Sequence, residues 1–280
     1  MARKLRLPHS RCIQYDGLMA TINDFQGKWA LITGASAGIG QALARDLASH
    51  GAKLVLTARR ADRLEAFAAE LRGKGTEVRI VPADLNDPAA PQQLYDATVG
   101  AGLVVDILIN NAGLGLYGAH TESDPNQEMS QIRVNCEAVV RLSRLFVPPM
   151  VERRRGWVLV LASTASFQPV PYLSTYAATK AFDRFFALGL AAEVARFGVK
   201  VTALCPGPTE SEFFDVAKAT IFKARGYQSA EIVAQRGIAA LARGERTIIP
   251  YFAGWFTALL VRFLPVGLIT FFVEKEARPK

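Results

Sequence analysis

The stretch TGASAGIG, residues 33–40, constrains the fold of this 280-residue chain more than any other feature. It directly follows an apolar run that is typical of a buried strand, and it opens a helical pattern. In that context the first glycine allows a tight turn, the second lets the backbone approach a pyrophosphate, and the third lets the helix pack close to the sheet. The helix start also favours phosphate through its free N–H groups and its dipole. The expected phosphate-binding residues are Gly34, Ser36, Ala37, Gly38, Ile39 and Gly40.

Apolar strand patterns and helical patterns alternate along the chain. Strands are predicted over 29–33, 53–59, 77–84, 105–110, 156–163, 199–207 and 246–249. Helices are predicted over 39–50, 62–72, 88–101, 126–150, 174–197 and 229–242. Continuous apolar strands separated by helices are typical of a parallel sheet covered on both faces. The prediction is an α/β fold: one Rossmann-type doubly wound domain over 24–250 with about seven strands, which binds ligands beyond the carboxyl ends of the strands.

Both ends of the chain are expected to lie outside this domain. Residues 1–23 are predicted to be a disordered extension, and Met19 is an alternative start of the native chain. The tail, residues 251–280, is strongly apolar, but Arg262 and Pro265 interrupt it. A membrane-spanning helix needs about 20 mostly apolar residues in a row. The remaining alternatives are that the tail lies on a membrane surface, or that it packs on the body or on a second subunit.

Composition excludes several classes of protein. The net charge is +8 and the pI is 9.6, but the basic residues are dispersed and no nucleic-acid motif accompanies them, so no nucleic-acid partner is predicted. An anionic cofactor also suits a basic chain. The three Cys and three His are scattered without metal-ligand spacing, which predicts no metal site and no disulfide scaffold. A reducing, cytoplasmic location is predicted, with peripheral membrane association if the tail lies on a bilayer.

The residues after the second predicted strand bear on the choice of cofactor. They read Thr57-Ala58-Arg59-Arg60, with no acidic residue at the strand end. An acidic side chain there binds ribose hydroxyls, whereas arginine accommodates a 2′-phosphate. Arg59 and Arg60 therefore favour NADP over NAD. After the third strand, Asp84 and its neighbour Leu85 are expected near the adenine, although Asp84 is also typical of an Asx turn or a helix cap.

Two further motifs complete a set. NNAG, residues 110–113, follows the fourth strand, where small residues let the backbone pass close to a ribose. YAATK, residues 176–180, places Tyr176 and Lys180 on one face of a helix, since residues four apart are neighbours. Taken alone, such a Tyr–Lys pair has little specificity.

TGASAGIG, NNAG, the serine of LVLAS, YAATK and CPGPT, in this order, resemble the short-chain dehydrogenase/reductase family over residues 24–250. The resemblance implies a single Rossmann-type domain, an NAD(P) cofactor, and a homodimer or homotetramer. Ser163 lies thirteen residues before Tyr176, as in the family, and Asn135 of VNCEAV matches the family's catalytic asparagine. The further cofactor residues that the resemblance implies are Asn111, Ala112, Gly113, Tyr176, Lys180, Pro206, Gly207 and Thr209.

The chemistry of carbonyl reduction suits these residues. A reduced ketone receives a hydride on carbon and a proton on oxygen. A tyrosine has a reference pKa near 10, and a nearby ammonium group is expected to lower the pKa of Tyr176. Ser163 is expected to bond the carbonyl oxygen, and Asn135 to hold a water that links Lys180 to solvent. Tyr176 would then act as general acid in reduction and general base in oxidation.

The substrate class follows from the aromatic residues near the motifs. The region 210–228 corresponds to the family's variable lid, and the residues expected to form an apolar pocket with the catalytic Ser163 are Phe167, Tyr172, Phe213 and Phe214. The leading prediction is an NADP(H)-dependent oxidoreductase that interconverts a ketone or aldehyde and an alcohol on a lipid, steroid or acyl chain.

Two alternatives remain open. The first is a 3-oxoacyl-thioester reductase, which predicts a basic patch at the pocket mouth; residues 153–155, all arginine, are the candidate patch. The second comes from another class: a non-catalytic NADP-binding sensor or scaffold. Members of that kind often lose the tyrosine or the lysine, whereas this chain keeps Asn135, Ser163, Tyr176 and Lys180.

Overall fold

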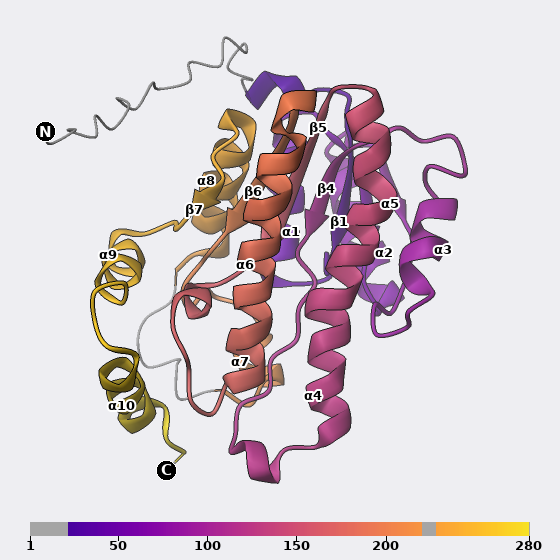
Figure 1. Ribbon diagram of the computed structural model, residues 1–280. Coiled ribbons are helices and arrows are strands. Elements are labelled where there is room, and N and C mark those ends of the chain that lie inside the picture. Colours follow the sequence, from indigo (N-terminus) through magenta and orange to yellow (C-terminus); the bar gives the residue numbers. More distant parts are fainter. Residues whose placement is uncertain (1–21, 220–227, 280) are drawn as a thin grey trace, which may run out of the picture.

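The computed structural model describes residues 22–219 and 228–279 (Figure 1). The predictions made for residues 1–21, and those made for the lid at 220–227, lie outside the described residues. Seven strands form one parallel sheet in the order β3-β2-β1-β4-β5-β6-β7. Their bounds are β1 Trp29–Thr33, β2 Lys53–Thr57, β3 Val78–Ile80, β4 Val105–Asn110, β5 Gly156–Leu161, β6 Val199–Leu204 and β7 Thr247–Ile248. The predicted seven-stranded, doubly wound fold is confirmed.

Helices cover both faces of the sheet (Figure 1). One apolar cluster joins the sheet to α1 Gly38–Ser49, α2 Ala61–Gly73 and α8 Ala230–Arg243. A second cluster joins the other face to α3 Ala90–Asp96, α5 Ala138–Glu152 and α6 Ser174–Val194. Strands β1, β4 and β5 are almost entirely buried, which explains why their sequences are apolar without alternation.

Several strands end earlier than predicted. Strand β3 spans only Val78–Ile80, although 77–84 was predicted. Beyond it the Val81 and Ala83 N–H groups still donate to the Leu56 and Ala58 carbonyls of the β2 segment, at 3.0 and 3.2 Å, but the chain no longer forms a regular ladder. The predicted helix over 88–101 is likewise shorter, since α3 ends at Asp96 and the chain then turns through Gly102 at φ 84°. The early end of β3 lengthens a loop at the carboxyl edge of the sheet, and the early end of α3 lengthens the connection to the start of β4 at the opposite edge.

The helix predicted over 126–150 consists of three consecutive segments. These are α4 Pro125–Ile132, a π-helical turn η3 Arg133–Glu137, and α5. The helix continues past Pro148 and Pro149 to Glu152, because both prolines fall in its last turns, where the apolar side chains around them are buried. Asn135 lies in the π-helical turn, a local distortion that is frequent at functional sites. The remaining short helices are η1 Ile22–Phe25, η2 His120–Glu122, η4 Thr164–Phe167, η5 Ala195–Phe197 and α7 Phe213–Val216.

The apolar tail forms two helices, α9 Phe252–Leu260 and α10 Val266–Ala277, along one side of the body (Figure 1). Within residues 22–219 and 228–279, no helix combines the length and apolar character needed to cross a membrane. Helix α10 is bound to the body because Tyr117 Oη donates to the Ala277 carbonyl at 2.7 Å, and Tyr172 Oη donates to Glu274 Oε1 at 2.9 Å. Packing of the tail on the body, one of the predicted alternatives, is therefore observed.

Candidate active site

The carboxyl ends of the strands open into a cavity of about 1150 Å³. Every residue that the sequence predicts to bind the cofactor lines this cavity, from Gly34 in the first turn to Thr209 after β6. The cavity lies where a doubly wound sheet binds ligands, on both sides of the point at which the strand order reverses between β1 and β4.

The glycine-rich turn has the geometry that a phosphate requires. Gly34 adopts φ 65°, and a Cβ there would lie 2.9 Å from the Ala112 Cα atom. A Cβ on Gly40 would lie 2.3 Å from the Gly34 carbonyl oxygen. The N-cap residue of α1, Ala37, makes no side-chain cap, so the first N–H groups of the helix remain free for an anion. These features fit the pyrophosphate of a dinucleotide.

The NNAG turn is tied to the end of β1. Asn111 Nδ2 donates to the Thr33 carbonyl at 2.8 Å, and Thr33 Oγ1 accepts the backbone N–H groups of Asn111 and Ala112, both at 2.9 Å. Asn111 and Thr33 thus hold the ends of β4 and β1 together. Asp84 lines the cavity, but its Oδ1 accepts the Asn86 N–H at 3.0 Å, so it forms the Asx turn that was the alternative reading. The contact of Asp84 with an adenine stays a prediction.

Arg60 lies at the edge of the glycine-rich turn. Its guanidinium donates to Ser36 Oγ at 3.3 Å and pairs with Glu212 Oε2 at 2.9 Å. Arg63 from α2 also pairs with Glu212, and hydrogen bonds from Arg63 and Arg60 hold the pKa of the Glu212 carboxyl below its usual range. Arg59 lines the same cavity. Sequence reasoning missed Arg63 and Glu212, because no local pattern indicates that the lid meets α2.

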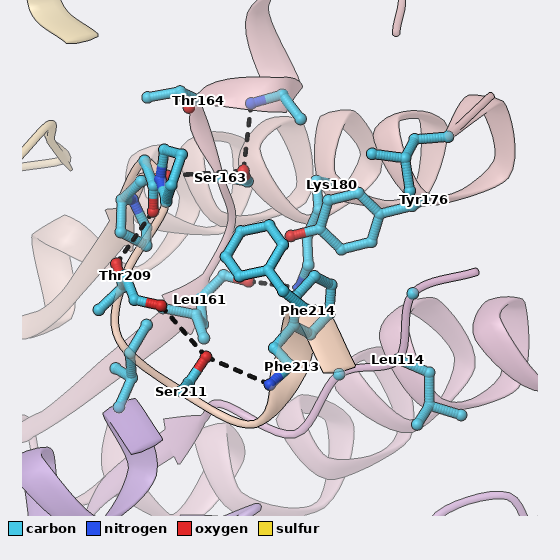
Figure 2. Close-up of a pocket in the computed structure, with 18 of the residues that line it drawn as sticks. Leu114, Leu161, Ser163, Thr164, Tyr176, Lys180, Thr209, Ser211, Phe213 and Phe214 are labelled. Atoms are coloured by element: carbon cyan, nitrogen blue, oxygen red, sulfur yellow. Dashed lines mark hydrogen bonds between the residues drawn. The ribbon is translucent and has the colours of Figure 1, made fainter. Parts of the chain in front are cut away.

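Tyr176, Lys180 and Ser163 face a common space at the end of β5 (Figure 2). Tyr176 and Lys180 lie one turn apart on α6, and a hydrogen bond joins the Tyr176 and Ser163 side chains. Lys180 Nζ donates to the Leu161 carbonyl at 2.7 Å and to Asp183 Oδ2 at 3.0 Å. The sequence predicted the first three residues but not Asp183.

The electrostatics of Tyr176 differ from the prediction. Burial raises the pKa of the Tyr176 hydroxyl, and although Lys180 and the Ser163 hydrogen bond both lower it, the pKa remains above its ordinary value. Lys180 lowers the pKa of Tyr176, as predicted. The prediction that this pKa lies below its ordinary value was nevertheless wrong, because desolvation of the phenolate is the larger effect. Tyr176 is therefore held in its protonated form, which is the form that donates a proton.

Asn135 is fully buried, and its contacts are with the protein. Its Oδ1 accepts the Leu114 N–H at 2.8 Å, while its Nδ2 donates to the Leu114 carbonyl at 2.9 Å and to Thr179 Oγ1 at 2.8 Å. The side chain thus fixes the segment after NNAG against α6. The predicted role of Asn135 in holding a water stays a prediction.

The wall near Tyr176 is apolar. Phe167, Phe213 and Phe214 line the cavity as predicted, and the Phe213 ring centroid lies 5.1 Å from that of Tyr176 (Figure 2). Tyr172 does not line it: this residue adopts a left-handed backbone conformation at φ 63° and directs its hydroxyl to Glu274 of α10. Its assignment to the substrate wall is therefore corrected, since its contact is with the tail.

Sequence reasoning missed the part of this wall that comes from the tail. The tail residues that line the cavity include Ala258, Val261, Leu264, Ile269 and Val273. Tyr251 also reaches it, so close to Gly207 that a Cβ on this glycine would overlap the Tyr251 hydroxyl. The apolar composition of the tail was a signal, but composition does not indicate which surface a helix covers.

The arginines at 153–155 do not form the predicted patch at the pocket mouth. They immediately precede β5, where Arg153 donates to the Val105 carbonyl at 3.0 Å and Arg155 to the Asp24 carbonyl at 3.4 Å. These contacts lie at the amino-terminal edge of the sheet, opposite the edge that carries Tyr176. Over residues 22–219 and 228–279, no group of three His, Cys, Asp or Glu is arranged to hold a metal.

A dinucleotide turn facing a tyrosine, lysine and serine across one cavity defines the class: an oxidoreductase of Rossmann type that acts on CH–OH and C=O groups with a nicotinamide nucleotide. A family model described as short chain dehydrogenase matches residues 28–221. The chain belongs to the short-chain dehydrogenase/reductase family.

Curated relatives carry two kinds of name. A very-long-chain 3-oxoacyl-CoA reductase of Anas platyrhynchos is 30% identical over 242 residues, which cover 84% of this chain and 76% of the relative. The human protein of that name is 34% identical over 70% of this chain and 64% of its own length. A serine 3-dehydrogenase of Rhizobium radiobacter is 35% identical over 74% of this chain and 80% of the relative. The chain thus spans between about two thirds and four fifths of these proteins.

Solved structures agree on the fold and differ in cofactor. A short-chain dehydrogenase from Sphingobium yanoikuyae in complex with NADPH is 31% identical, with a TM-score of 0.77, covering 85% of this chain and 96% of that one. A short-chain dehydrogenase/reductase from Burkholderia phymatum in complex with NAD is 29% identical, with a TM-score of 0.78, covering 84% and 93%. The family resemblance alone therefore does not choose between NADP and NAD.

Proposed function

We propose that this protein is an NADP(H)-dependent carbonyl reductase for an apolar substrate, a ketone on a lipid, steroid or acyl chain. One observation carries the proposal. A single cavity runs from Arg60, past Ser163 and Tyr176, to the apolar wall formed by α9 and α10. A phosphorylated cofactor and a long hydrophobic substrate can therefore meet at the tyrosine.

The preference for NADP rests on Arg60 and Arg59. The end of β2 carries no carboxylate that would bind ribose hydroxyls, and the Arg60 guanidinium lies beside Ser36 of the glycine-rich turn. A guanidinium group binds a phosphate through paired, charge-assisted hydrogen bonds. Glu212 competes for the same guanidinium, so a 2′-phosphate would have to displace it.

The catalytic residues act on the carbonyl oxygen. The nicotinamide cofactor, when bound, supplies the hydride that reaches the carbonyl carbon. Tyr176 donates its hydroxyl proton to the oxygen, and Ser163 donates a hydrogen bond that stabilises the developing charge. Lys180, held by Leu161 and Asp183, stabilises the phenolate that Tyr176 becomes and keeps one N–H for the cofactor ribose. The reverse sequence oxidises the alcohol.

A 3-oxoacyl thioester with a long acyl chain is the second candidate substrate. The relatives named very-long-chain 3-oxoacyl-CoA reductase favour it, and the tail wall suits an extended acyl chain. The arginines at 153–155 do not contribute to it, since they lie at the other edge of the sheet. If the substrate carries coenzyme A, its phosphates must bind elsewhere.

The test of the proposed function is cofactor oxidation by the purified protein. NADPH and NADH would be compared with aldehydes, steroid ketones, quinones, and short and long 3-oxoacyl thioesters, with Tyr176→Phe as the control. We expect NADPH-dependent turnover that grows with the apolar length of the substrate and falls about 10²–10⁴-fold in the variant. Equal turnover in the variant would refute the role of Tyr176. Tight NADPH binding without turnover on any class would favour the sensor or scaffold.

The outer face of the tail supports a membrane-surface contact. Exposed side chains on α9, α10 and their connection include Phe252, Trp255, Phe256, Phe263 and Phe271. Exposed aromatic and aliphatic side chains can insert at the boundary between the headgroups and the acyl chains of a bilayer. The positive net charge of the chain would favour a surface of anionic lipid. We therefore propose a cytoplasmic protein that binds membranes peripherally.

Sedimentation with anionic vesicles tests this contact. The double variant Phe252→Ser/Phe263→Ser should lose vesicle binding, whereas Phe185→Ser on α6 should retain it. If the tail instead joins two copies, the double variant will change the molar mass in light scattering without affecting vesicle binding.

A homodimer or homotetramer is expected to pair through α5 and α6, where Val140, Phe182 and Phe185 are exposed.

A further inference from the structure

A buried carboxylate lies one turn beyond Lys180 on α6, and the proposed mechanism gives it no part in proton transfer. Asp183 is 1% exposed, and its Oδ2 lies 3.0 Å from Lys180 Nζ. Its second oxygen, Oδ1, is buried and has no hydrogen-bond partner among the described residues. Burying a charged carboxylate costs free energy unless an opposite charge compensates it. Asp183 therefore depends on Lys180 to stay charged at this position.

Lys180 depends on Asp183 to the same degree. The ammonium group is itself almost completely buried, with 4% of its side chain exposed. Burial lowers the pKa of a lysine, and here Asp183 and Tyr176 more than offset this effect, so the pKa of Lys180 is above its ordinary value. Without a counter-charge, a lysine in such a site tends to lose its proton.

The other groups around this pair carry no charge that could replace the carboxylate. Among the described residues, those that face it electrostatically are Cys136 from η3, Cys205 at the end of β6, and Tyr176 on the same helix. Burial raises the pKa of both thiols to about 12, so both are neutral at physiological pH. Tyr176 is also protonated. Asp183 is therefore the negative charge that compensates Lys180.

We propose that Asp183 is a positioning residue of the active site: it keeps Lys180 in the charged form and anchors two of its three N–H groups jointly with the Leu161 carbonyl. The third N–H is then left for the cavity, which Lys180 and Tyr176 both line. This inference rests on the proposed function only for the role of Lys180 in catalysis. Its consequence for cofactor binding can be measured without turnover.

Burial raises the pKa of the Asp183 carboxyl to about 6, so the carboxylate is charged above pH 7. The test is the pH dependence of NADPH affinity, measured by fluorescence between pH 7 and pH 9. In the wild-type protein Lys180 stays charged, so the affinity should change little over this range. In Asp183→Asn, which keeps the shape and one acceptor oxygen, the affinity should weaken as pH rises, approaching tenfold per pH unit once Lys180 is deprotonated. The alkaline limb of kcat/KM for reduction should move to lower pH in parallel.

Asp106 provides a matched control. This residue is also buried, at 7% exposure, but it lies at the start of β4 and away from the cavity. Asp106→Asn should leave both pH profiles unchanged in shape, whatever its effect on melting temperature. Asp183→Glu, which restores the charge, should restore a flat binding profile. If Asp183→Asn shows the wild-type profile with only a lower stability, Asp183 is merely structural and the proposal is wrong.

If Asp183→Asn does not fold, a second variant still tests the proposal. An unpaired buried ammonium is what should destabilise it, so adding Lys180→Met in the same chain should restore a cooperative thermal transition. A double variant no more stable than the single one would refute the coupling. Failure of the proposed function would look different, because NADPH binding and its pH dependence would persist while the turnover of every carbonyl class was absent.

Discussion

The contribution of Arg60 to cofactor choice can be worked out from its contacts. A charge-assisted hydrogen bond to a phosphate contributes about 1.5–3 kcal/mol. Binding of the 2′-phosphate must first break the pair with Glu212, whose side chain is 47% exposed and whose loss costs about 0.2–1 kcal/mol. The difference, roughly 0.5–2.8 kcal/mol, corresponds to about 2- to 100-fold in affinity. Since the Arg60 side chain is 41% exposed, the lower half of this range is expected.

Arg60→Ala should therefore raise the KM for NADPH by about 2- to 15-fold, while the KM for NADH stays at about the wild-type value. The assay is the initial rate with one saturating carbonyl substrate and varied cofactor. Arg45→Ala is the control, because Arg45 is 39% exposed and pairs with Glu70 at 2.9 Å, but lies on α1 outside the cavity. An equal rise of both KM values, or no change for NADPH, would refute the assignment of the phosphate to Arg60.

Three further outcomes are expected. Glu212→Gln should tighten NADPH binding about two- to fivefold in fluorescence titrations, since the carboxylate no longer competes for the arginines; weaker binding would contradict this. Gly40→Ala should lower the melting temperature by several degrees, because the added Cβ would overlap the Gly34 carbonyl oxygen. Gly189→Ala on α6 should raise the melting temperature, because a Cβ there meets open space and alanine favours the helix. Ending the chain at Pro250 should raise the KM for a long-chain carbonyl at least ~10-fold and leave that of a short one unchanged.

Much of the fold could be predicted because it depends on short-range patterns. Buried parallel strands are continuous apolar runs, and helices repeat at 3.6 residues, so their alternation identified the doubly wound sheet. Strand ends were predicted less well, because an apolar run does not show where the backbone leaves the regular ladder: after β3 the Val81 and Ala83 N–H groups still donate to the β2 segment, although the strand has ended. The prediction that the arginines at 153–155 lie at the pocket mouth was wrong, because residues that precede a parallel strand lie at the edge of the sheet opposite the cavity.

The sequence predicted which residues meet at the candidate site, but not the electrostatics of that site. Parallel strands bring all their carboxyl ends to one edge, so residues after β1, β4, β5 and β6 necessarily converge there. The pKa of Tyr176, by contrast, depends on how much water its surroundings exclude, which no spacing encodes. Asp183 could not be predicted for a similar reason. The helical pattern does not distinguish it from the other polar residues of α6, and its charge matters only because the folded protein buries it.

The sequence by itself determined the order of elements, the dinucleotide turn, and the Ser163, Tyr176 and Lys180 group, because each depends on local geometry or on the direction of the strands. Only the tertiary structure decided that the tail lines the cavity beside Tyr176, that Tyr172 holds α10 through Glu274, and that Glu212 meets Arg60. These contacts join segments far apart in the chain. They follow from how whole surfaces pack against each other, and a pattern within one segment carries no information about the surface it will meet.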